Sequence, residues 1–206
     1  MTTFLLVRHA AHDWLGRGVP GRMPGVALNA LGRQQAEALA QRLGEEVSGL
    51  SALYSSPQQR ARETVAPLAA RWGLPVELAN EFDEIDFGGW TGWTMAQLEA
   101  DTERWRQWVE HRGTAAPPGG EPFAQVAGRT VAGIERLSAL HPRQTILVLS
   151  HGDVIKAVLA AFLELSLDGL ERFDIEPASL SVLVTEGAWC QVKRVNQTLT
   201  GPLLPP

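Results

Sequence analysis

Two short apolar runs stand far apart in the chain, at residues 4–7 (Phe-Leu-Leu-Val) and 146–149 (Ile-Leu-Val-Leu). A continuous apolar run of this length, without polar residues at every second position, is typical of a strand covered on both faces. The first run leads into Arg8 and His9, and the second leads into Ser150 and His151. The pattern therefore predicts two buried parallel strands, each with a histidine at its carboxyl end.

Helical segments and further short strands fill the rest of the chain. Helices are predicted after Asn29, from Ser56 to Trp72, irregularly over 90–112, and over 121–140 and 154–163; strands are predicted at 52–54, 76–78, 179–185 and 189–195. The last two strands form a hairpin, because only three residues separate them. This order predicts an α/β fold, a three-layer α/β/α sandwich with a mainly parallel central sheet and an antiparallel edge hairpin.

The length of the chain, 206 residues, predicts one domain over 1–206. A lid or insert is expected around 88–122, because this stretch is irregular and contains Pro117-Pro118-Gly119-Gly120. The segment 201–206 is expected to be irregular. Cys190 is the only cysteine, so an internal disulfide and a thiolate metal site are both excluded.

Charge and hydropathy exclude several kinds of partner. The formal net charge is -5, whereas nucleic-acid binding calls for a basic face. No apolar run approaches the ~20 residues of a membrane-spanning helix. Met1 leads directly into a predicted strand without a basic leader segment, so we expect a cytoplasmic protein with neither a membrane nor a nucleic acid as partner. A homodimer is compatible with the sequence, which does not define the oligomeric state.

The two histidines are expected to meet at one edge of the sheet. Ligands of open parallel sheets bind at the carboxyl ends of the strands, so His9, His151 and Arg8 can converge on a single anion there. Arg8 follows four apolar residues, where a guanidinium without an anionic partner would be costly. The alternative is that each histidine is a hydrogen-bonded structural residue and that Arg8 forms a structural ion pair.

A helix start supplies a second arginine. Ser56, Pro57 and Gln59 match an N-cap, a first helical position and a capping-box position. Arg60 then lies in the first turn, where free backbone amides also favour an anion. Arg62 is rotated by roughly 200° from Arg60 on the helix and is expected to lie at the surface.

Four segments together resemble the histidine phosphatase superfamily, also called the phosphoglycerate-mutase-like family. The segments are Arg8-His9, Ser55 to Thr64, Glu84 to Gly92, and Ser150-His151-Gly152. The family pattern is a strand ending in Arg-His-Gly, then Ser-x-x-x-Arg-Ala-x-x-Thr, a Glu four residues before a Gly, and a late Ser-His-Gly. This chain departs from the first motif, with Ala10 in place of Gly, Ala11 in place of Glu and Leu15 in place of a phosphate-contacting Asn.

The resemblance implies a role for each site residue. His9 would be the nucleophile that forms a phosphohistidine, and Arg8, Arg60 and His151 would bind the phosphoryl group and stabilise its charge. Glu84 would protonate the leaving oxygen and later activate water, which calls for a raised pKa. No metal and no cofactor are implied, and the residues alone show no metal-ligand spacing. The residues by themselves do not order the roles of His9 and His151.

Some residues near the motifs have more than one interpretation. Glu84 belongs to an acidic cluster that can be a solvated loop, and Asp83 and Asp86 are the fallback carboxylates. Arg22 is a candidate contact for a second anionic group of the substrate, or else a solvent-exposed charge. The tryptophans of the predicted lid either pack in the core or form a pocket wall that selects substrates; they are Trp90, Trp93, Trp105 and Trp108.

Three functions follow from these observations. The favoured one is a metal-independent phosphomonoesterase that hydrolyses a small phosphorylated metabolite through a phosphohistidine. A cofactor-dependent phosphoglycerate mutase is the second, although the chain is shorter than typical mutases of this family. The third is a weakly active phospho-ligand binding or regulatory protein, which the departures at Ala10, Ala11 and Leu15 suggest.

Overall fold

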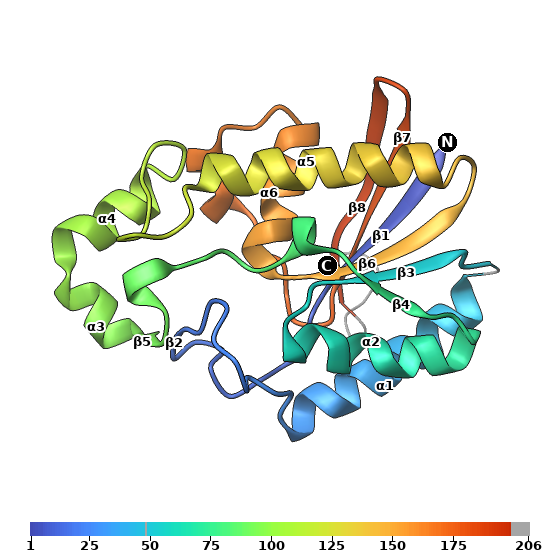
Figure 1. Ribbon diagram of the computed structural model, residues 1–206, viewed down its shortest axis with the longest axis horizontal. Helices are drawn as coiled ribbons and strands as arrows, with labels where there is room; N and C mark the ends of the chain where they lie inside the picture. The colour runs from blue at the N-terminus through green and yellow to red at the C-terminus, as the bar shows by residue number, and fades with distance from the viewer. Residues whose placement is uncertain (48, 199–206) are drawn as a thin grey trace, which may run out of the picture.

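A six-stranded sheet forms the centre of the computed structural model, which describes residues 1–47 and 49–198 (Figure 1). The strand order is β4-β3-β6-β1-β7-β8. The strands are β1 Thr2–Arg8, β3 Ala52–Ser55, β4 Val76–Leu78, β6 Thr145–Ser150, β7 Leu180–Glu186 and β8 Trp189–Gln197. The first four in spatial order, β4, β3, β6 and β1, run parallel to one another. Strand β7 runs antiparallel to both of its neighbours, β1 and β8. This confirms the predicted mainly parallel sheet with an antiparallel edge hairpin.

Helices cover both faces of the sheet. On one face lie α1 (Ala30–Glu46) and α2 (Gln59–Trp72), and on the other lie α5 (Phe123–Leu140) and α6 (Gly152–Phe162) (Figure 1). Side chains of β1 alternate between the two resulting cores: Leu5 packs with the α1 and α2 side, and Phe4 with the α5 and α6 side. Because both faces are covered, the central strands are apolar at nearly every position, as their sequences indicated.

The predicted start of one helix at Asn29 and the predicted end of another at Trp72 are confirmed, and the predicted start at Ser56 is wrong. The Asn29 side chain accepts a hydrogen bond from Gly32 N and caps α1, and Gly73 ends α2 with a positive φ of 62°. Ser56, however, is not the N-cap of α2, which begins at Gln59 after Gln58. The Ser56 hydroxyl lies one turn before the helix: it accepts from Gln58 N at 3.3 Å, donates to Asp83 and lies 2.7 Å from His151 Nε2.

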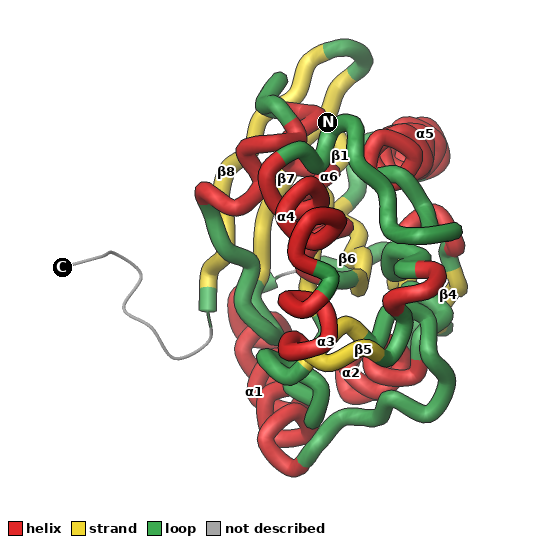
Figure 2. The backbone as a smooth tube through the Cα atoms, turned by 90° about the vertical axis from the view of Figure 1, so that its left-hand side faces the viewer, coloured by secondary structure: helices red, strands yellow, loops and turns green. Residues whose placement is uncertain are grey.

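The segment over 88–122 lies beyond the carboxyl edge of the sheet, at the left of Figure 1 and facing the viewer in Figure 2. It contains the 3-10 turn η2 (Gly88–Trp90), β5 (Trp93–Thr94), α3 (Met95–Ala100) and α4 (Thr102–Glu110). Strand β5 pairs with β2 (Gly18–Val19), a two-stranded contact that sequence patterns did not predict because each strand has only two residues. The remaining short elements are η1 (Asn80–Phe82) and η3 (Leu167–Arg172).

An apolar cluster ties this segment to α5 and α6. Trp90 and Trp108 are each 1 % exposed and pack with Phe123 of α5 and Val154 of α6. Trp108 also contacts Trp90 and Phe123 through its ring. These two tryptophans are therefore core residues, which is one of the two interpretations open from the sequence.

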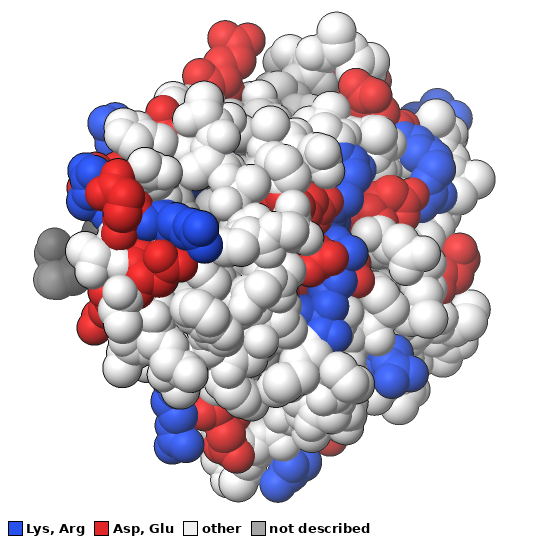
Figure 3. All heavy atoms as spheres, turned by 60° about the vertical axis from the view of Figure 1, so that its left-hand side comes forward, with Lys and Arg blue, Asp and Glu red and all other residues white. Residues whose placement is uncertain are grey.

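Charged side chains of both signs lie close together on the face shown in Figure 3. On α4, for example, Arg106 pairs with Glu103 and Glu110 at 3.0 Å each. In the part of the chain that the structure describes, no helix has the length and apolarity needed to cross a membrane. The segment 201–206, predicted to be irregular, lies outside the described residues.

Candidate active site

His9 and His151 lie side by side at the carboxyl edge of the sheet. Strands β1 and β6 are parallel neighbours with Arg8 opposite Ser150, so the residue after each strand end reaches the same place. The two imidazole centroids are 5.1 Å apart, and the residues are 2 % and 0 % exposed. The structure thus brings together the two histidines that the apolar runs placed at one edge.

The ring of His9 is held in one tautomer. Its Nδ1 lies 2.9 Å from the carbonyl oxygen of Ala10, which can only accept, so Nδ1 carries the proton. The Nε2 lone pair is then free on the opposite side of the ring. Burial, with the charges of His151 and Arg60, holds the pKa of His9 well below its ordinary value. His9 is therefore a neutral imidazole with an unprotonated nitrogen at ordinary pH.

Two arginines offer unpaired donors beside His9. Arg60 is 0 % exposed, and its Nη2 donates to the Gly21 carbonyl at 3.0 Å and to Glu84 Oε2 at 3.1 Å. Arg8 donates from Nη1 to the Ile175 carbonyl. Within residues 1–47 and 49–198, however, Arg8 Nε, Arg60 Nε and Arg60 Nη1 are buried without a hydrogen-bond partner. Buried guanidinium donors without acceptors are costly, and an anion with several oxygens would satisfy them.

His151 joins a chain of hydrogen-bonding groups. Its Nδ1 is 3.2 Å from Glu84 Oε2, and its Nε2 is 2.7 Å from the Ser56 hydroxyl, which in turn donates to Asp83 at 3.0 Å. Nδ1 also lies 3.2 Å from Arg60 Nη2, so it has both an acceptor, Glu84, and a donor, Arg60, beside it. Burial lowers the pKa of His151, and the nearby Glu84 carboxylate opposes that effect.

Glu84 is the acidic residue that faces the two histidines. Burial disfavours its charge, but His151 and Arg60 outweigh this effect and hold the pKa of Glu84 well below its ordinary value. The expected raised pKa is therefore wrong for this state of the site. The reason is geometric: one carboxylate oxygen lies within 3.2 Å of both the imidazole and the guanidinium.

Arg22 does not point into the site, where it was a candidate contact for a second anion. Its Nε donates to the Glu84 carbonyl at 2.7 Å, and its Nη2 donates to Glu121 at 3.0 Å. Arg129 of α5 donates to the carbonyls of Asp83 and Glu84 from the same side. Both arginines therefore fix the backbone that carries Glu84. Arg129 had no motif that could have identified it, because its contacts depend on how α5 packs.

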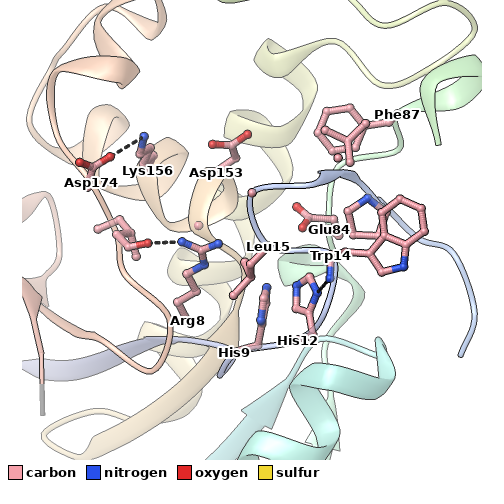
Figure 4. A pocket seen from close by; sticks show the side chains of 16 residues that line it. Arg8, His9, His12, Trp14, Leu15, Glu84, Phe87, Asp153, Lys156 and Asp174 are labelled. Carbon is pink, nitrogen blue, oxygen red and sulfur yellow. Dashed lines mark hydrogen bonds and ion pairs between the residues drawn. The ribbon is translucent and has the colours of Figure 1, made fainter. Parts of the chain in front are cut away.

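A cavity of about 220 Å³ opens beside Arg8, His9 and Glu84. Its walls contain Arg8, His9, Glu84 and Gly152, and also residues of the loop after β1 (Figure 4). Leu15, which stands in place of a phosphate-contacting Asn, and Phe87 of the Glu84 to Gly92 segment also line it, together with residues that no motif indicated, among them His12, Trp14, Asp153 and Lys156. The four tryptophans of the segment 88–122 are not among these wall residues; Trp14 and Phe87 supply the aromatic lining instead. Ala10 and Ala11, which depart from the family motif, are buried and hydrogen bonded through their backbone.

Three side chains of the site are also spaced as the ligands of a metal ion would be. Ligand atoms of His9, Glu84 and His151 lie within 4.8 Å of one another, a spacing that can hold a cation. The Glu84 oxygen that would bind it already accepts from Arg60, and Arg8 lines the same cavity. Arginine keeps its charge in proteins, so a metal ion here would face two fixed positive groups. The charges present favour an anion over a metal.

The buried histidines make stability depend on pH. The pKa of His12 is lowered to about 4, chiefly by burial, and the pKa values of His9 and His151 are lowered too. Below about pH 6.5 the unfolded chain binds more protons at these residues than the folded chain does, so acid favours unfolding. We expect the free energy of unfolding to fall as the pH decreases from 6.5 to about 4. Urea titration at each pH measures this free energy.

A His12→Gln variant tests how much of this pH dependence of stability comes from His12. It should lose part of this pH slope, less than the full ~1.4 kcal/mol per pH unit of one proton because His12 borders the cavity. His111→Gln, which changes an exposed histidine, is the matched control and should keep the slope. An unchanged slope in His12→Gln would mean that His12 is equally protonated in both states.

Comparison with known proteins agrees with this geometry. The histidine phosphatase superfamily (branch 1) matches residues 4–198. A bifunctional protein of Mycobacterium tuberculosis is 36 % identical in an alignment of 206 positions that covers 96 % of this chain and 54 % of that protein, so the chain spans about half of its length. Phosphoserine phosphatase 1 of Hydrogenobacter thermophilus is 33 % identical over 96 % of this chain and 93 % of its own.

A solved structure shares the whole architecture. The mycobacterial glucosyl-3-phosphoglycerate phosphatase in complex with VO3 superimposes with a TM-score of 0.86 at 29 % identity, and the match covers 95 % of this chain and 99 % of that one. The family match over nearly the whole described chain, the strand order and the paired histidines lead to one conclusion. The chain belongs to the histidine phosphatase superfamily, branch 1.

Proposed function

We propose that this protein is a metal-independent phosphomonoesterase that hydrolyses a small phosphorylated metabolite through a phosphohistidine. The observation that carries the proposal is the free Nε2 of His9 beside three unpaired, buried guanidinium donors. A phosphoryl group needs a nucleophile in line with its leaving oxygen and positive charge around its other oxygens. The phosphatase names of two relatives that match over more than nine-tenths of both chains support the same reaction class.

The first step transfers the phosphoryl group to the enzyme. His9 Nε2 forms a bond to phosphorus while the bond from phosphorus to the ester oxygen breaks, and the departing oxygen takes a proton from Glu84. Because Nδ1 is already fixed to the Ala10 carbonyl, His9 attacks without losing a proton. Arg8, Arg60 and His151 surround the transferring oxygens and stabilise their charge.

The second step returns the enzyme to its starting state. Glu84, now a carboxylate, takes a proton from water, the water oxygen bonds to phosphorus, and the bond between phosphorus and His9 breaks. Inorganic phosphate leaves, and Glu84 holds the proton that the next cycle needs. A bound phosphate dianion adds negative charge beside Glu84 and draws Arg60 and His151 toward its own oxygens. Both effects raise the pKa of Glu84 from its low value, which allows it to hold that proton.

Hydrolysis should survive removal of divalent metal ions. Excess chelator is expected to leave the rate on p-nitrophenyl phosphate within about twofold, since arginine and histidine side chains supply the positive charge a metal would provide. Vanadate should inhibit competitively. The assay is initial rate with and without chelator, and a strict need for an added divalent ion would overturn the proposal.

A panel of phosphorylated metabolites identifies the substrate range and separates the alternatives. Release of inorganic phosphate supports the phosphatase. Isomerisation of 2- and 3-phosphoglycerate that depends on bisphosphoglycerate, without net phosphate release, would indicate the mutase. Tight phosphate binding without turnover would indicate the binding protein.

A further inference from the structure

His12 is a buried histidine of the loop after β1 that the steps above do not use. It is 4 % exposed, and it lines the cavity next to His9 (Figure 4). The ring centroids of His12 and His9 are 4.9 Å apart, whereas those of His9 and His151 are 5.1 Å apart. His12 therefore lies as close to His9 as the histidine that stabilises the phosphoryl group does.

Two contacts fix the position of the His12 ring. The backbone of His12 forms an antiparallel bridge with Leu28. The ring accepts a hydrogen bond at Nδ1 from the backbone N–H of Trp14, at 3.2 Å. In Figure 4 this hydrogen bond lies on the side of the ring away from His9. A backbone N–H can only donate, so Nδ1 carries a lone pair and Nε2 carries the proton of the neutral ring.

The Nε2–H of His12 is an unused donor. It makes no hydrogen bond with any residue in 1–47 or 49–198. The fully covered side-chain atoms without a partner in this part of the chain belong to Arg8, Arg60, Arg112 and Ser179. Because His12 Nε2 is not one of them, a ligand in the cavity that His12 lines can reach it.

His12 is neutral beside the two arginines of the site. Burial, together with the positive charges of Arg60 and Arg8, lowers the pKa of its imidazole to about 4. At ordinary pH the ring therefore offers an N–H donor without adding a positive charge to those of the arginines.

The two neighbouring histidines have opposite tautomers. His9 carries its proton on Nδ1, bound to the Ala10 carbonyl, and has a lone pair at Nε2. His12 has its lone pair at Nδ1, bound to the Trp14 N–H, and its proton at Nε2. His12 is thus a donor and not a second nucleophile. A phosphoryl group bonded to His9 Nε2 would carry oxygens that can accept the Nε2–H of His12.

We propose that His12 binds the phosphoryl group, by donating from Nε2 to one of its oxygens both in the substrate and in the phosphohistidine. The inference rests on the proposed function and adds a residue to the same site. A hydrogen bond to an anionic oxygen is stronger than one between neutral groups. A neutral donor suits this place, because a further positive charge beside Arg8 and Arg60 would add to the cost of burying them.

Two substitutions separate this role from a structural one. In His12→Asn the amide oxygen stands the same number of bonds from Cβ as Nδ1, so it can accept from Trp14 N, but no donor reaches as far as Nε2 did. In His12→Gln the amide nitrogen stands the same number of bonds from Cβ as Nε2, so the donor is kept and the acceptor for Trp14 N is lost. A role in phosphoryl binding therefore predicts a loss in His12→Asn, and a role in the loop predicts a loss in His12→Gln.

Inorganic phosphate is the probe, and isothermal titration calorimetry measures its Kd. His12→Asn should raise this Kd by about 10- to 100-fold, the value of a hydrogen bond to a charged group, and should lower kcat/KM for p-nitrophenyl phosphate by a similar factor. His12→Gln should keep the Kd within about threefold of the wild type, because its donor replaces that of the imidazole. His111→Asn, at an exposed histidine, is the matched control and should bind phosphate as the wild type does.

Two results in the variants would overturn the inference. One is an unchanged Kd in His12→Asn. The other is a larger loss in His12→Gln than in His12→Asn, since the contact with Trp14 would then be what matters.

Nitrogen NMR of the imidazole rings tests the donor without any substitution. The spectrum of the free wild type should show the proton of His12 on Nε2, and the resonance of that proton should move downfield when phosphate is added. A proton on Nδ1, or a resonance that does not respond to saturating phosphate, would contradict the inference.

Binding is measured apart from turnover, so the inference and the proposed function can fail separately. If the wild type hydrolyses no phosphomonoester but His12→Asn binds phosphate more weakly than His12→Gln, the proposed function fails and the donor role of His12 stands. If hydrolysis occurs and His12→Asn binds phosphate as tightly as the wild type, the inference alone fails.

Discussion

His9→Ala is expected to lower kcat by more than about 10³-fold, the scale seen when a nucleophile that acts with its partners is removed. The loss follows from the geometry, since Nε2 of His9 is the unprotonated nitrogen and His9 lines the cavity. The fold should be retained, because β1 ends one residue earlier and keeps its pairing with β6. Single-turnover kinetics and far-UV circular dichroism measure the two effects.

Trapping of the intermediate identifies the nucleophile directly. Acid quenching with labelled substrate should place acid-labile phosphate on His9 in the wild type and on no residue in His9→Ala. His111→Ala, at an exposed histidine, is the control and should be labelled normally. Label on His151, or normal turnover by His9→Ala, would refute the assignment.

Glu84→Gln is expected to slow phosphoenzyme formation from alkyl phosphates by about 10²–10⁴-fold, the range of general acid catalysis. An alkoxide is a poor leaving group unless it is protonated, whereas an acidic phenol leaves without a proton. The deficit should therefore shrink as the pKa of the leaving group falls. Rapid-quench measurement of the first turnover is suitable, because Glu84 also acts in the later attack by water.

Asp86→Asn provides the control from the same acidic cluster. Asp86 accepts a hydrogen bond from Gly88 N at 2.9 Å, and Asp83 accepts from Ser56 and Gln58; neither fallback carboxylate lines the cavity, whereas Glu84 does. The rate of Asp86→Asn should show no dependence on the leaving group. If Glu84→Gln slows alkyl and activated aryl phosphates equally, Glu84 is not the proton donor.

The convergence of His9 and His151 could be predicted because it depends on local signals. Each histidine ends a buried apolar run, and the ends of parallel strands meet at one edge. The place of Arg60 could be predicted for a similar reason, because the sequence shows that a helix starts near Ser56. The predicted first residue of that helix was wrong. The acidic cluster could not be resolved by pattern alone, and Glu84 was chosen only through the family motif.

Other features depend on contacts between distant segments and could not be predicted. From the sequence Arg22 is a candidate substrate contact or else a solvent-exposed charge, yet its partners, the Glu84 carbonyl and the Glu121 carboxylate, come from other loops. The low pKa of Glu84 requires the distances to His151 and Arg60. Lys156 lies on an apolar helix, where its charge gives no indication of which side it faces.

The place of β6 in the sheet determines when the site can form as the protein folds. Strand β6 lies between β3 and β1, both of which precede it by a long stretch of chain. Until β6 is inserted, the strand that carries His9 and the strand that leads to Arg60 have no common neighbour to hold them together. Parallel pairing over such separations is a slow kind of folding event, because the entropy of a long loop is lost before any contact compensates for it. A ribosome-bound chain would therefore hold its arginines and first histidine without a phosphate pocket, and the pocket would appear only in the late, cooperative step that completes the sheet.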